Sequence, residues 1–282
     1  MRAGVVGLGR MGAGIASRLA ARGGLVGVWD VRPAQAAPAP VMEPARLAQA
    51  ADILLFAVPT TAEVRAALAG ADLRPGLIVV DLTTSDPAEG EALAGDLARG
   101  KVGYLDAAMT GGAQGAADGT LSLMIGGEAG DLARARPVLE CFAARLFHLG
   151  PAGRGQAMKL VHNAILHATY LATCEGLRMA ERAGIGPAEA VAVLNAGNAR
   201  SYVTEVRFPR DILKDEPSAR SAVGTLAKDL GLAAQMAARL GAPAPYAGMT
   251  ADLLAAACET GDPARDFGYL FREFDLVVEA AG

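Results

Sequence analysis

A lysine and an asparagine lie four residues apart in an otherwise largely apolar stretch, GQAMKLVHNAILHA, at residues 155 to 168. The stretch predicts a helix, in which positions i and i+4 lie one above the other, about 6 Å apart. Lys159 and Asn163 should therefore project as a pair. Burying an ammonium group is costly unless its charge is matched or removed. The pair is either a lysine that reaches solvent beside a capping amide, or a reactive site.

A glycine motif, GLGRMG at residues 7 to 12, follows an apolar run and precedes a helical pattern. In a dinucleotide site the first glycine makes a tight turn, the second lets the backbone approach a pyrophosphate, and the third lets the helix pack closely. The start of the helix adds free N–H groups for the phosphates. The motif predicts a nicotinamide dinucleotide site that contains Gly7, Leu8, Gly9, Arg10, Met11 and Gly12.

Asp30 ends the second apolar run, 18 residues after Gly12. A carboxylate there can bind both hydroxyls of the adenosine ribose and repels a 2′-phosphate, so we expect NAD. Arg32 could accept that phosphate or cover the adenine, which keeps NADP possible, and Val31 between them belongs to the same predicted site. The following segment, VRPAQAAPAPVMEP, is interrupted by prolines. We therefore do not expect a full helix between Asp30 and Asp52.

The elements that must position these residues follow two sequence patterns, one in each half of the chain. In the first half, short apolar runs alternate with helical patterns, which predicts a parallel, doubly wound, Rossmann-type sheet with ligands at the carboxyl ends of its strands. The expected strands are 3–8, 25–30, 52–58, 77–82, 103–109, 120–127 and 145–150, with a helix at about 131–143 before the last.

From residue 155 onward strands disappear and helical patterns dominate. The first helix should run to about residue 183, before GIGP, and would span about 45 Å at 1.5 Å per residue. That is long enough to join two domains. We expect an NAD(P)-binding Rossmann domain at 1–152 and an all-α substrate and oligomerisation domain at 153–282.

The composition excludes several classes of protein. The 282 residues are 52% hydrophobic and 20% charged, with a net charge of −4 and no basic block, which argues against nucleic acid as a partner. No apolar run approaches the roughly 18 residues that a membrane span needs. No metal-ligand spacing is present, and the early first strand leaves no room for a signal peptide. Three separated cysteines, Cys141, Cys174 and Cys258, favour a reducing, cytoplasmic setting.

Four blocks of sequence occur in the order of a known family: GLGRMG, DAAMTGGAQGAADGTLSLMIGG (106–127), GRGQAMKLVHN (153–163) and KDLGLA (228–233). Over nearly its whole length the chain resembles the β-hydroxyacid dehydrogenases, which include 3-hydroxyisobutyrate dehydrogenase and tartronate semialdehyde reductase. The resemblance implies hydride transfer between a nicotinamide cofactor and a small 3-hydroxyacid, or reduction of the matching semialdehyde.

The resemblance also assigns roles to residues. Lys159 would be the catalytic acid/base, and burial together with the positive nicotinamide of NAD⁺ would favour its neutral amine. Asn163 would hold Lys159 or a substrate oxygen. The substrate carboxylate would bind where adjacent glycines let backbone N–H groups converge, although a simple glycine turn is the alternative. This site contains Thr110, Gly111 and Gly112, where the family usually has Pro-x-Ser before the glycines.

Further residues of the cofactor site follow from the same resemblance. Thr84 and the pair Val58 and Pro59 would lie beside the nicotinamide; taken alone they are ordinary turn residues. Lys228 would reach from the helical domain to the cofactor and substrate. Its alternative is a surface lysine paired with Asp229.

Other functions stay open at this stage. An imine reductase would have a similar architecture but commonly carries Asp or Tyr at the position of Lys159. A non-catalytic dinucleotide-binding scaffold would not need Lys159, Asn163 and Lys228 together. Residues 194–209 resemble the substrate-facing stretch of the family, in which Arg200 and Ser201 either meet a distal substrate group or cap a helix. Ala-rich segments at 165–181 and 232–257 suit a homodimer or homotetramer.

Overall fold

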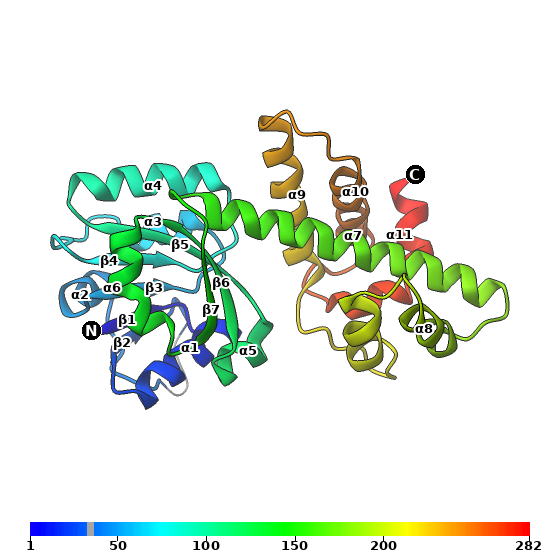
Figure 1. Cartoon of the computed structure of the whole chain (residues 1–282), viewed down its shortest axis with the longest axis horizontal. Coiled ribbons are helices and arrows are strands. Elements are labelled where there is room, and N and C mark those ends of the chain that lie inside the picture. Colours follow the sequence, from blue (N-terminus) through cyan, green and yellow to red (C-terminus); the bar gives the residue numbers. More distant parts are fainter. Residues whose placement is uncertain (33–36) are drawn as a thin grey trace. The chain divides into compact units, whose positions relative to one another are not determined.

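The computed structural model describes residues 1–32 and 37–282, and it consists of an α/β unit and a helical unit (Figure 1). The units are Met1–Lys159 and Leu160–Gly282, so the division falls within helix α7, Arg154–Arg182. Residues 33–36 of the proline-interrupted segment lie outside the described residues. Beyond them, helix α2 (Pro44–Ala50) has only seven residues, in agreement with the expectation of an incomplete crossover helix.

The α/β unit contains a seven-stranded sheet in the order β2-β1-β3-β4-β5-β6-β7. The first five strands are mutually parallel, whereas β6 runs antiparallel to β5. The sequence-based expectation of a parallel sheet is therefore wrong at β6. Only ten residues join β5 to β6, and a parallel return needs a connection of about a dozen or more. The strands are β1 (Ala3–Val6), β2 (Leu25–Trp29), β3 (Ile53–Phe56), β4 (Ile78–Asp81), β5 (Gly103–Thr110), β6 (Leu121–Gly127) and β7 (Ala143–His148).

Helices cover both faces of the sheet, which confirms the doubly wound prediction (Figure 1). Successive strand residues point to opposite faces, so Leu55 packs with one cluster and its neighbour Phe56 with the other. One face packs against α1 (Arg10–Ala21), α5 (Gly112–Asp118) and α6 (Ala129–Leu139). The other packs against α2, α3 (Thr61–Leu68) and α4 (Pro87–Arg99).

The starts of α3 and α4 are fixed by local signals that the sequence carries. Thr60 and Glu63 form a capping box at α3, in which the backbone N–H of Thr60 donates to the Glu63 carboxylate at 2.9 Å. Asp86 caps α4 by accepting the N–H of Ala88 at 2.9 Å, and Pro87 occupies the first helical position. Both helices therefore begin just after the carboxyl ends of strands, where ligands bind in this class of fold.

Helix α7 has 29 residues and its bounds lie within one residue of the expected 155–183. It ends in a Schellman motif, because Ile185 N–H donates to Ala180 O at 2.9 Å and Gly184 takes a φ of +82°. Its last 23 residues belong to the helical unit, in which the structure describes α8 (Pro187–Ala196), the π-helix η1 (Val203–Ile212), α9 (Val223–Arg239), α10 (Pro245–Thr260), the 3₁₀-helix η2 (Phe267–Phe271) and α11 (Phe274–Ala281).

The core of the helical unit is built around aromatic side chains. Tyr170 of α7 lies edge-on to Phe267 with ring centroids 5.1 Å apart, and Phe208 lies edge-on to Phe271 at 5.4 Å. Such edge-to-face pairs add to the stability that burial of the rings supplies. The Tyr170 hydroxyl also donates to Phe267 O at 3.0 Å, so its one polar group is satisfied inside the core.

Candidate active site

The predicted cofactor residues of the α/β unit follow the carboxyl ends of neighbouring strands. Val6, which ends β1, pairs with Trp29 of β2 and Phe56 of β3, and Phe56 pairs with Asp81 of β4. Because these strands are parallel and in register, the residues that follow them share one edge of the sheet. That edge carries Gly7 to Gly12, Asp30 to Arg32, Val58, Pro59 and Thr84.

The three motif glycines differ in their surroundings in the way that their predicted roles require. Gly7 has a φ of +93°, in the region that favours glycine. A Cβ on Gly12 would lie 1.9 Å from Gly7 O, so the helix could not approach the strand with any larger residue. A Cβ on Gly9 would meet no heavy atom within 4 Å. The chain therefore needs Gly12 and Gly7 for its own packing, while the open side of Gly9 fits a ligand that approaches the backbone.

Asp30 is held at this edge by backbone donors. Leu8 N–H donates to its Oδ2 at 2.6 Å and Arg32 N–H to its Oδ1 at 2.8 Å. Burial by itself would raise the pKa of Asp30, but these two bonds and the Arg32 guanidinium outweigh it and lower the pKa below its ordinary value. The Arg32 side chain is 82% exposed and lies 3.8 Å from the carboxylate. A fixed, ionised carboxylate thus sits beside the glycine motif.

The predicted carboxylate site lies at the far end of β5. This strand extends four residues beyond Asp106, the register partner of Asp81, so that Thr110 pairs only with β6. Gly111 and Gly112 follow with φ values of +124° and +67°, and both are exposed. A Cβ on Gly112 would meet no atom within 4 Å. The backbone here is open to an anion, and the positive φ values favour glycine.

Lys159 lies in the second turn of α7 and is half-buried. In this chain by itself, burial of Lys159 is partial rather than complete. The reason is its position on the helix, since Leu160 takes the buried position and Met158 is 40% exposed. Lys159 occupies the border of the buried stripe, where a side chain can reach both the interior and a ligand.

Asn163, one turn further along α7, is 4% exposed and its orientation is determined by its neighbours. Its Nδ2 donates to Asp229 Oδ2 at 2.7 Å, and its Oδ1 lies 3.0 Å from His162 Nδ1. A carboxylate can only accept, so the amide nitrogen must face Asp229 and His162 must carry its proton on Nδ1. Lys228 Nζ lies 2.9 Å from Asp229 Oδ1. This is the pairing with Asp229 that the sequence offered as the alternative for Lys228.

Asp229 is the residue of this group that sequence reasoning missed as a functional candidate. Its side chain is 7% exposed, and it contacts both Asn163 and Lys228. The available signal was the position of a charged residue on the apolar face of α9, within the KDLGLA block. Sequence alone could not show that this carboxylate faces α7 rather than only its neighbour Lys228.

A buried polar cluster in the α/β unit was also missed. Asp81 and Asp106 are fully buried register partners on adjacent strands, and Gln156 of α7 is fully buried beside them. Burial raises the pKa of Asp106 to about 7 although backbone N–H groups of Gln156 and Gly153 donate to it, and the charge of Asp81 adds to the rise. The sequence signal was the pair of aspartates inside two apolar strand patterns.

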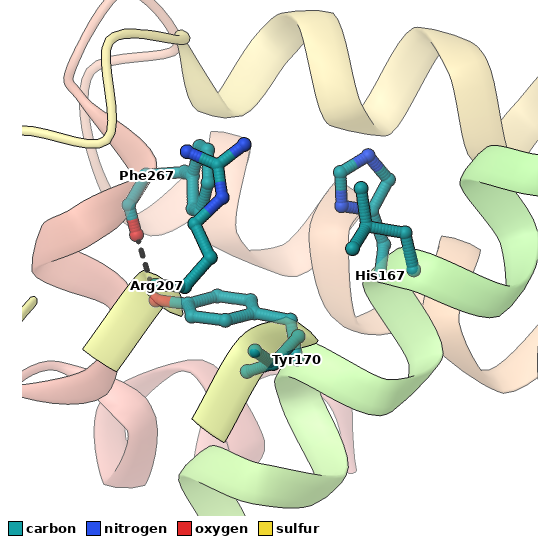
Figure 2. Close-up of a pocket in the computed structure, with 6 residues that line it drawn as sticks. His167, Tyr170, Arg207 and Phe267 are labelled. Carbon is teal, nitrogen blue, oxygen red and sulfur yellow. Dashed lines mark hydrogen bonds between the residues drawn. The ribbon is translucent and has the colours of Figure 1, made fainter. Parts of the chain in front are cut away.

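The stretch 194–209 contributes to a hollow in the helical unit, which Figure 2 shows with Arg207, Tyr170 and Phe267 gathered at one end and His167 at the other. The Arg207 guanidinium lies 5.3 Å from the centre of the Phe267 ring. The hollow is lined by Leu166, His167, Tyr170, Val203, Arg207 and Phe267.

The two residues that the sequence offered for a distal substrate group have other surroundings. Arg200 is exposed. The Ser201 hydroxyl accepts the N–H of Thr204 at 3.3 Å, and Ser201 N–H donates to the Thr204 hydroxyl at 2.8 Å. Ser201 therefore bonds to the first turn of η1, next to its cap residue Tyr202, which is close to the helix-end role of the alternative expectation.

Two features that other kinds of site require do not occur in the part of the chain that the structure describes. In residues 1–32 and 37–282 no helix is both long and apolar enough to cross a membrane. Over the same residues no group of three or more His, Cys, Asp or Glu side chains could hold a metal ion.

Comparison with known proteins adds two family models that together cover most of the chain. Residues 2–150 match the NAD-binding domain of 6-phosphogluconate dehydrogenase. Residues 153–273 match the NAD-binding domain of NADP-dependent 3-hydroxyisobutyrate dehydrogenase. The first model corresponds to the sheet and its glycine motif, and the second to α7 and the helices that follow as far as η2.

Individual relatives match over almost their whole length. The chain is 31% identical to L-threonate dehydrogenase of Cupriavidus necator, covering 96% of this chain and 95% of the relative. It is 29% identical to an NAD-dependent L-serine dehydrogenase of Pseudomonas aeruginosa, covering 96% of each. The structure of 3-hydroxyisobutyrate dehydrogenase of Mycobacterium tuberculosis with L-serine superimposes with a TM-score of 0.86 at 28% identity, over 97% of this chain and 99% of that one.

The doubly wound sheet with its glycine motif, the long helix with Lys159 and the matched models define a nicotinamide-dependent oxidoreductase that acts on small hydroxyacids. Within that class, the chain belongs to the β-hydroxyacid dehydrogenase family. An imine reductase from a Pseudomonas species, at 19% identity and a TM-score of 0.64, shares the fold alone.

Proposed function

We propose that Lys159 is the general acid/base of a 3-hydroxyacid dehydrogenase. The observation that carries this proposal is the position of Lys159 at the border of the buried face of α7, one turn before the oriented amide of Asn163. In the oxidising direction the Lys159 amine takes the proton of the substrate hydroxyl, and in reduction it returns that proton. The names of the relatives, which are dehydrogenases of hydroxyacids, support the reaction class.

The residues present fit a dinucleotide at the glycine motif. The backbone of Gly9 is approachable, Asp30 is ionised and can accept hydrogen bonds from two ribose hydroxyls, and Leu8 N–H fixes that carboxylate. When bound, the nicotinamide accepts or returns the hydride of the reaction. Asp30 supports NAD as the cofactor, while the exposed Arg32 leaves room for use of NADP.

Two further sets of residues hold the substrate in this proposal. The substrate carboxylate binds to the Thr110 hydroxyl and to the open backbone N–H groups of Gly111 and Gly112. The positive φ values of these two residues suit glycine. Asn163, kept in one orientation by Asp229, holds Lys159 or a substrate oxygen. Val58, Pro59 and Thr84 line the cofactor edge, and Lys228 adds a positive charge from α9.

A direct assay tests the function. Purified protein is mixed with 3-hydroxyisobutyrate, glycerate, threonate, serine or 4-hydroxybutyrate and either NAD⁺ or NADP⁺, and absorbance at 340 nm is followed. We expect turnover with at least one 3-hydroxyacid and a loss of kcat of about a thousandfold in Lys159→Met, because general acid/base groups contribute about 10²- to 10⁴-fold. Unchanged kcat in a Lys159→Met protein that still binds nucleotide would refute the role. Turnover of cyclic imines without turnover of hydroxyacids would favour an imine reductase instead, and nucleotide binding without any turnover would favour a scaffold.

In our proposal, Arg207 of the helical unit also contributes to the choice of substrate. Asn163, His167 and Tyr170 follow one stripe of α7 at spacings of four and three residues, and the last two line the hollow that contains Arg207. Arg210 already holds Asp211 through two bonds of 2.8 and 2.7 Å, whereas Arg207 lies 3.4 Å from the same carboxylate. Arg207 also donates to Ala219 O at 3.0 Å and lies over the Phe267 ring, so Asp211 balances its charge less closely than that of Arg210.

Arg210→Met is the matched control for this substrate proposal, because Arg210 contacts Asp211 without lining the hollow. In Arg207→Met we expect kcat/KM for threonate or glycerate to fall by about tenfold relative to 3-hydroxyisobutyrate, which carries a methyl branch where glycerate carries a hydroxyl. This change equals about 1.4 kcal/mol. Arg210→Met should leave that ratio within about twofold. An equal loss in both variants would mean that Arg207 serves only the fold.

We also propose that the helical unit forms an isologous homodimer or homotetramer. Large apolar side chains are exposed on α7 and α10, with Ile165 64%, Met179 63%, Tyr246 77% and Met249 63% exposed. Exposed apolar groups of this kind commonly mark subunit contacts. Size-exclusion chromatography with light scattering tests this, and a monomer of about 28.6 kDa over a range of concentrations would refute it.

We make two further proposals, one on the domain limits and one on the location of the protein in the cell. The matches at 2–150 and 153–273 support domain limits of 1–152 and 153–282. The three cysteines, which are free thiols in the structure, support a cytoplasmic location. Limited proteolysis checks the first, since cleavage should leave the sheet domain intact. Localisation of a tagged full-length protein checks the second.

A further inference from the structure

The block GRGQAMK, at residues 153 to 159, contains three residues, Gly153, Gly155 and Gln156, that the acid/base role of Lys159 does not explain. Two of them are glycines in tight surroundings. Gly153 has a φ of +88°, and a Cβ on Gly155 would lie 2.3 Å from Met124 O and 2.7 Å from Asp106 O. The first turn of α7 therefore lies directly against the backbone of β5 and β6. No larger residue allows that approach.

Asp106 of β5 fastens this turn. Its Oδ1 accepts the N–H of Gly153 at 2.9 Å, and its Oδ2 accepts the N–H of Gln156 at 2.7 Å. The first N–H groups of a helix have no partner inside the helix, so a carboxylate from a distant strand supplies the cap that α7 lacks locally. Asp106 is 0% exposed, and a Cβ on Gly126 would lie 2.4 Å from its Oδ1. Any residue larger than glycine at position 126 would therefore displace the carboxylate.

The side chain of Gln156 fastens the same turn from the other side. Its Nε2 donates to the Thr61 hydroxyl at 2.9 Å and lies 3.3 Å from Asp81 Oδ2. Tyr104 donates to that same oxygen of Asp81 at 2.9 Å, which completes a buried network between β4, β5 and the start of α3. Lys159 follows Gln156 by three residues, a rise of about 4.5 Å along the helix.

We propose that Asp106 and Gln156 are positioning residues that fix the turn of α7 from which Lys159 projects. Asp106 also belongs to the strand that ends in Thr110, so one rigid element carries both the cap of the Lys159 helix and the predicted carboxylate site. Every contact in this chain of support lies within Met1–Lys159. The proposal rests on the proposed function of Lys159, and it adds that Lys159 is reactive only because this clamp holds its helix.

The test compares Asp106→Asn, Asp106→Ala and Gln156→Leu with the wild-type chain. Asn keeps one acceptor oxygen, and Ala keeps none. We expect kcat to fall by about tenfold in Asp106→Asn and by about a hundredfold in Asp106→Ala, because a displacement near 1 Å can cost about 10²-fold. KM for the dinucleotide should stay within about twofold, since these residues do not touch the glycine motif. Val138→Ala, which thins the buried core beneath α6, controls for a general loss of stability.

Hydrogen exchange gives a readout that does not depend on turnover. Amides of residues 153–160 should lose protection in Asp106→Asn and Gln156→Leu, but not in Val138→Ala or in Lys159→Met. Full protection of that peptide with kcat within twofold of wild type in Asp106→Asn and Gln156→Leu would overturn the clamp. If Asp106→Ala does not fold, the other two variants decide. If Lys159→Met keeps its turnover, the proposed function fails while the exchange data still test the clamp.

Discussion

Asn163 of α7 donates a 2.7 Å hydrogen bond to Asp229 of α9, and this bond decides which way the amide faces. With its nitrogen fixed on the carboxylate, Asn163 presents its oxygen to His162 Nδ1 at 3.0 Å. A residue with two chemically different ends is thereby held in one orientation. The proposed roles of Asn163 depend on that orientation, because an amide that flips would offer a donor where an acceptor is needed.

Removing the carboxylate of Asp229 should therefore impair turnover more than removing its charge. Asp229→Asn can still accept the Asn163 amide and should keep kcat within about threefold. Asp229→Leu leaves a buried donor without a partner, which costs about 1–3 kcal/mol, so we expect kcat/KM to fall by about tenfold or more. Steady-state kinetics of both variants check this. Equal activity of the Leu variant and the wild-type chain would contradict the orienting role of Asp229.

Substitutions of two motif glycines should affect folding stability and cofactor affinity separately. Gly9→Ala adds a methyl group where the chain has no atom within 4 Å, so the melting temperature should not change while dinucleotide affinity falls at least tenfold. Gly12→Ala forces a Cβ to within 1.9 Å of Gly7 O and should lower the free energy of unfolding by about 1–3 kcal/mol or prevent folding. Thermal melts and titration with NADH provide the measurements. Unchanged NADH affinity in Gly9→Ala would argue against a pyrophosphate at this backbone.

Cofactor preference should depend on the charge of Asp30. Asp30→Ser removes the repulsion of a 2′-phosphate. It also removes the charge-assisted bonds to the two ribose hydroxyls, each of which is worth about 1.5–3 kcal/mol. We expect the ratio of kcat/KM for NAD to that for NADP to fall by about 10- to 100-fold. Arg32→Met, which alters an exposed side chain 3.8 Å from Asp30, should raise KM for NADP more than KM for NAD. A ratio that does not change in Asp30→Ser would place the ribose elsewhere.

The raised pKa of Asp106 predicts how stability depends on pH. Burial raises this pKa to about 7 from an ordinary value of 3.8, so between those values the folded chain keeps a proton that the unfolded chain has lost. This contribution to stability is fully present below about pH 4 and is lost as the pH rises through about 7. The melting temperature of the wild-type chain, relative to Asp106→Asn, should therefore decrease between about pH 4.5 and 7.5 and then level off.

Asp30→Asn is the control for that pH series, since the pKa of Asp30 is lowered rather than raised. The contribution of Asp30 is present above about pH 4 and is lost only at more acidic pH. The difference in melting temperature between wild type and Asp30→Asn should stay constant over the pH range in which the difference between wild type and Asp106→Asn changes. If the difference in melting temperature between wild type and Asp106→Asn is also constant, the Asp106 carboxylate is ionised at every pH tested. It would then be stabilised by the N–H groups of Gly153 and Gln156.

Local sequence was sufficient for the elements and the family. Short continuous apolar runs and glycines at the strand-to-helix turn act over a few residues, so they predict β1 and α1 without knowledge of the rest of the chain. The Asp86-Pro87 pair at the start of α4 is a local signal of the same kind. The 29-residue helix and its end at GIGP follow from the same kind of signal. The order of four blocks then identified the β-hydroxyacid dehydrogenase family, which the family models confirm.

Tertiary structure alone decided what lies beside what. The antiparallel direction of β6 depends both on the length of its connection to β5 and on the strand with which it pairs. Lys159 is half-buried because Leu160 takes the interior position of that turn. The contact of Asp229 with Asn163 joins residues 66 apart, and the bond between Asp106 and Gln156 joins residues 50 apart. No local pattern encodes such pairs, because a buried carboxylate is stable only where the fold supplies donors.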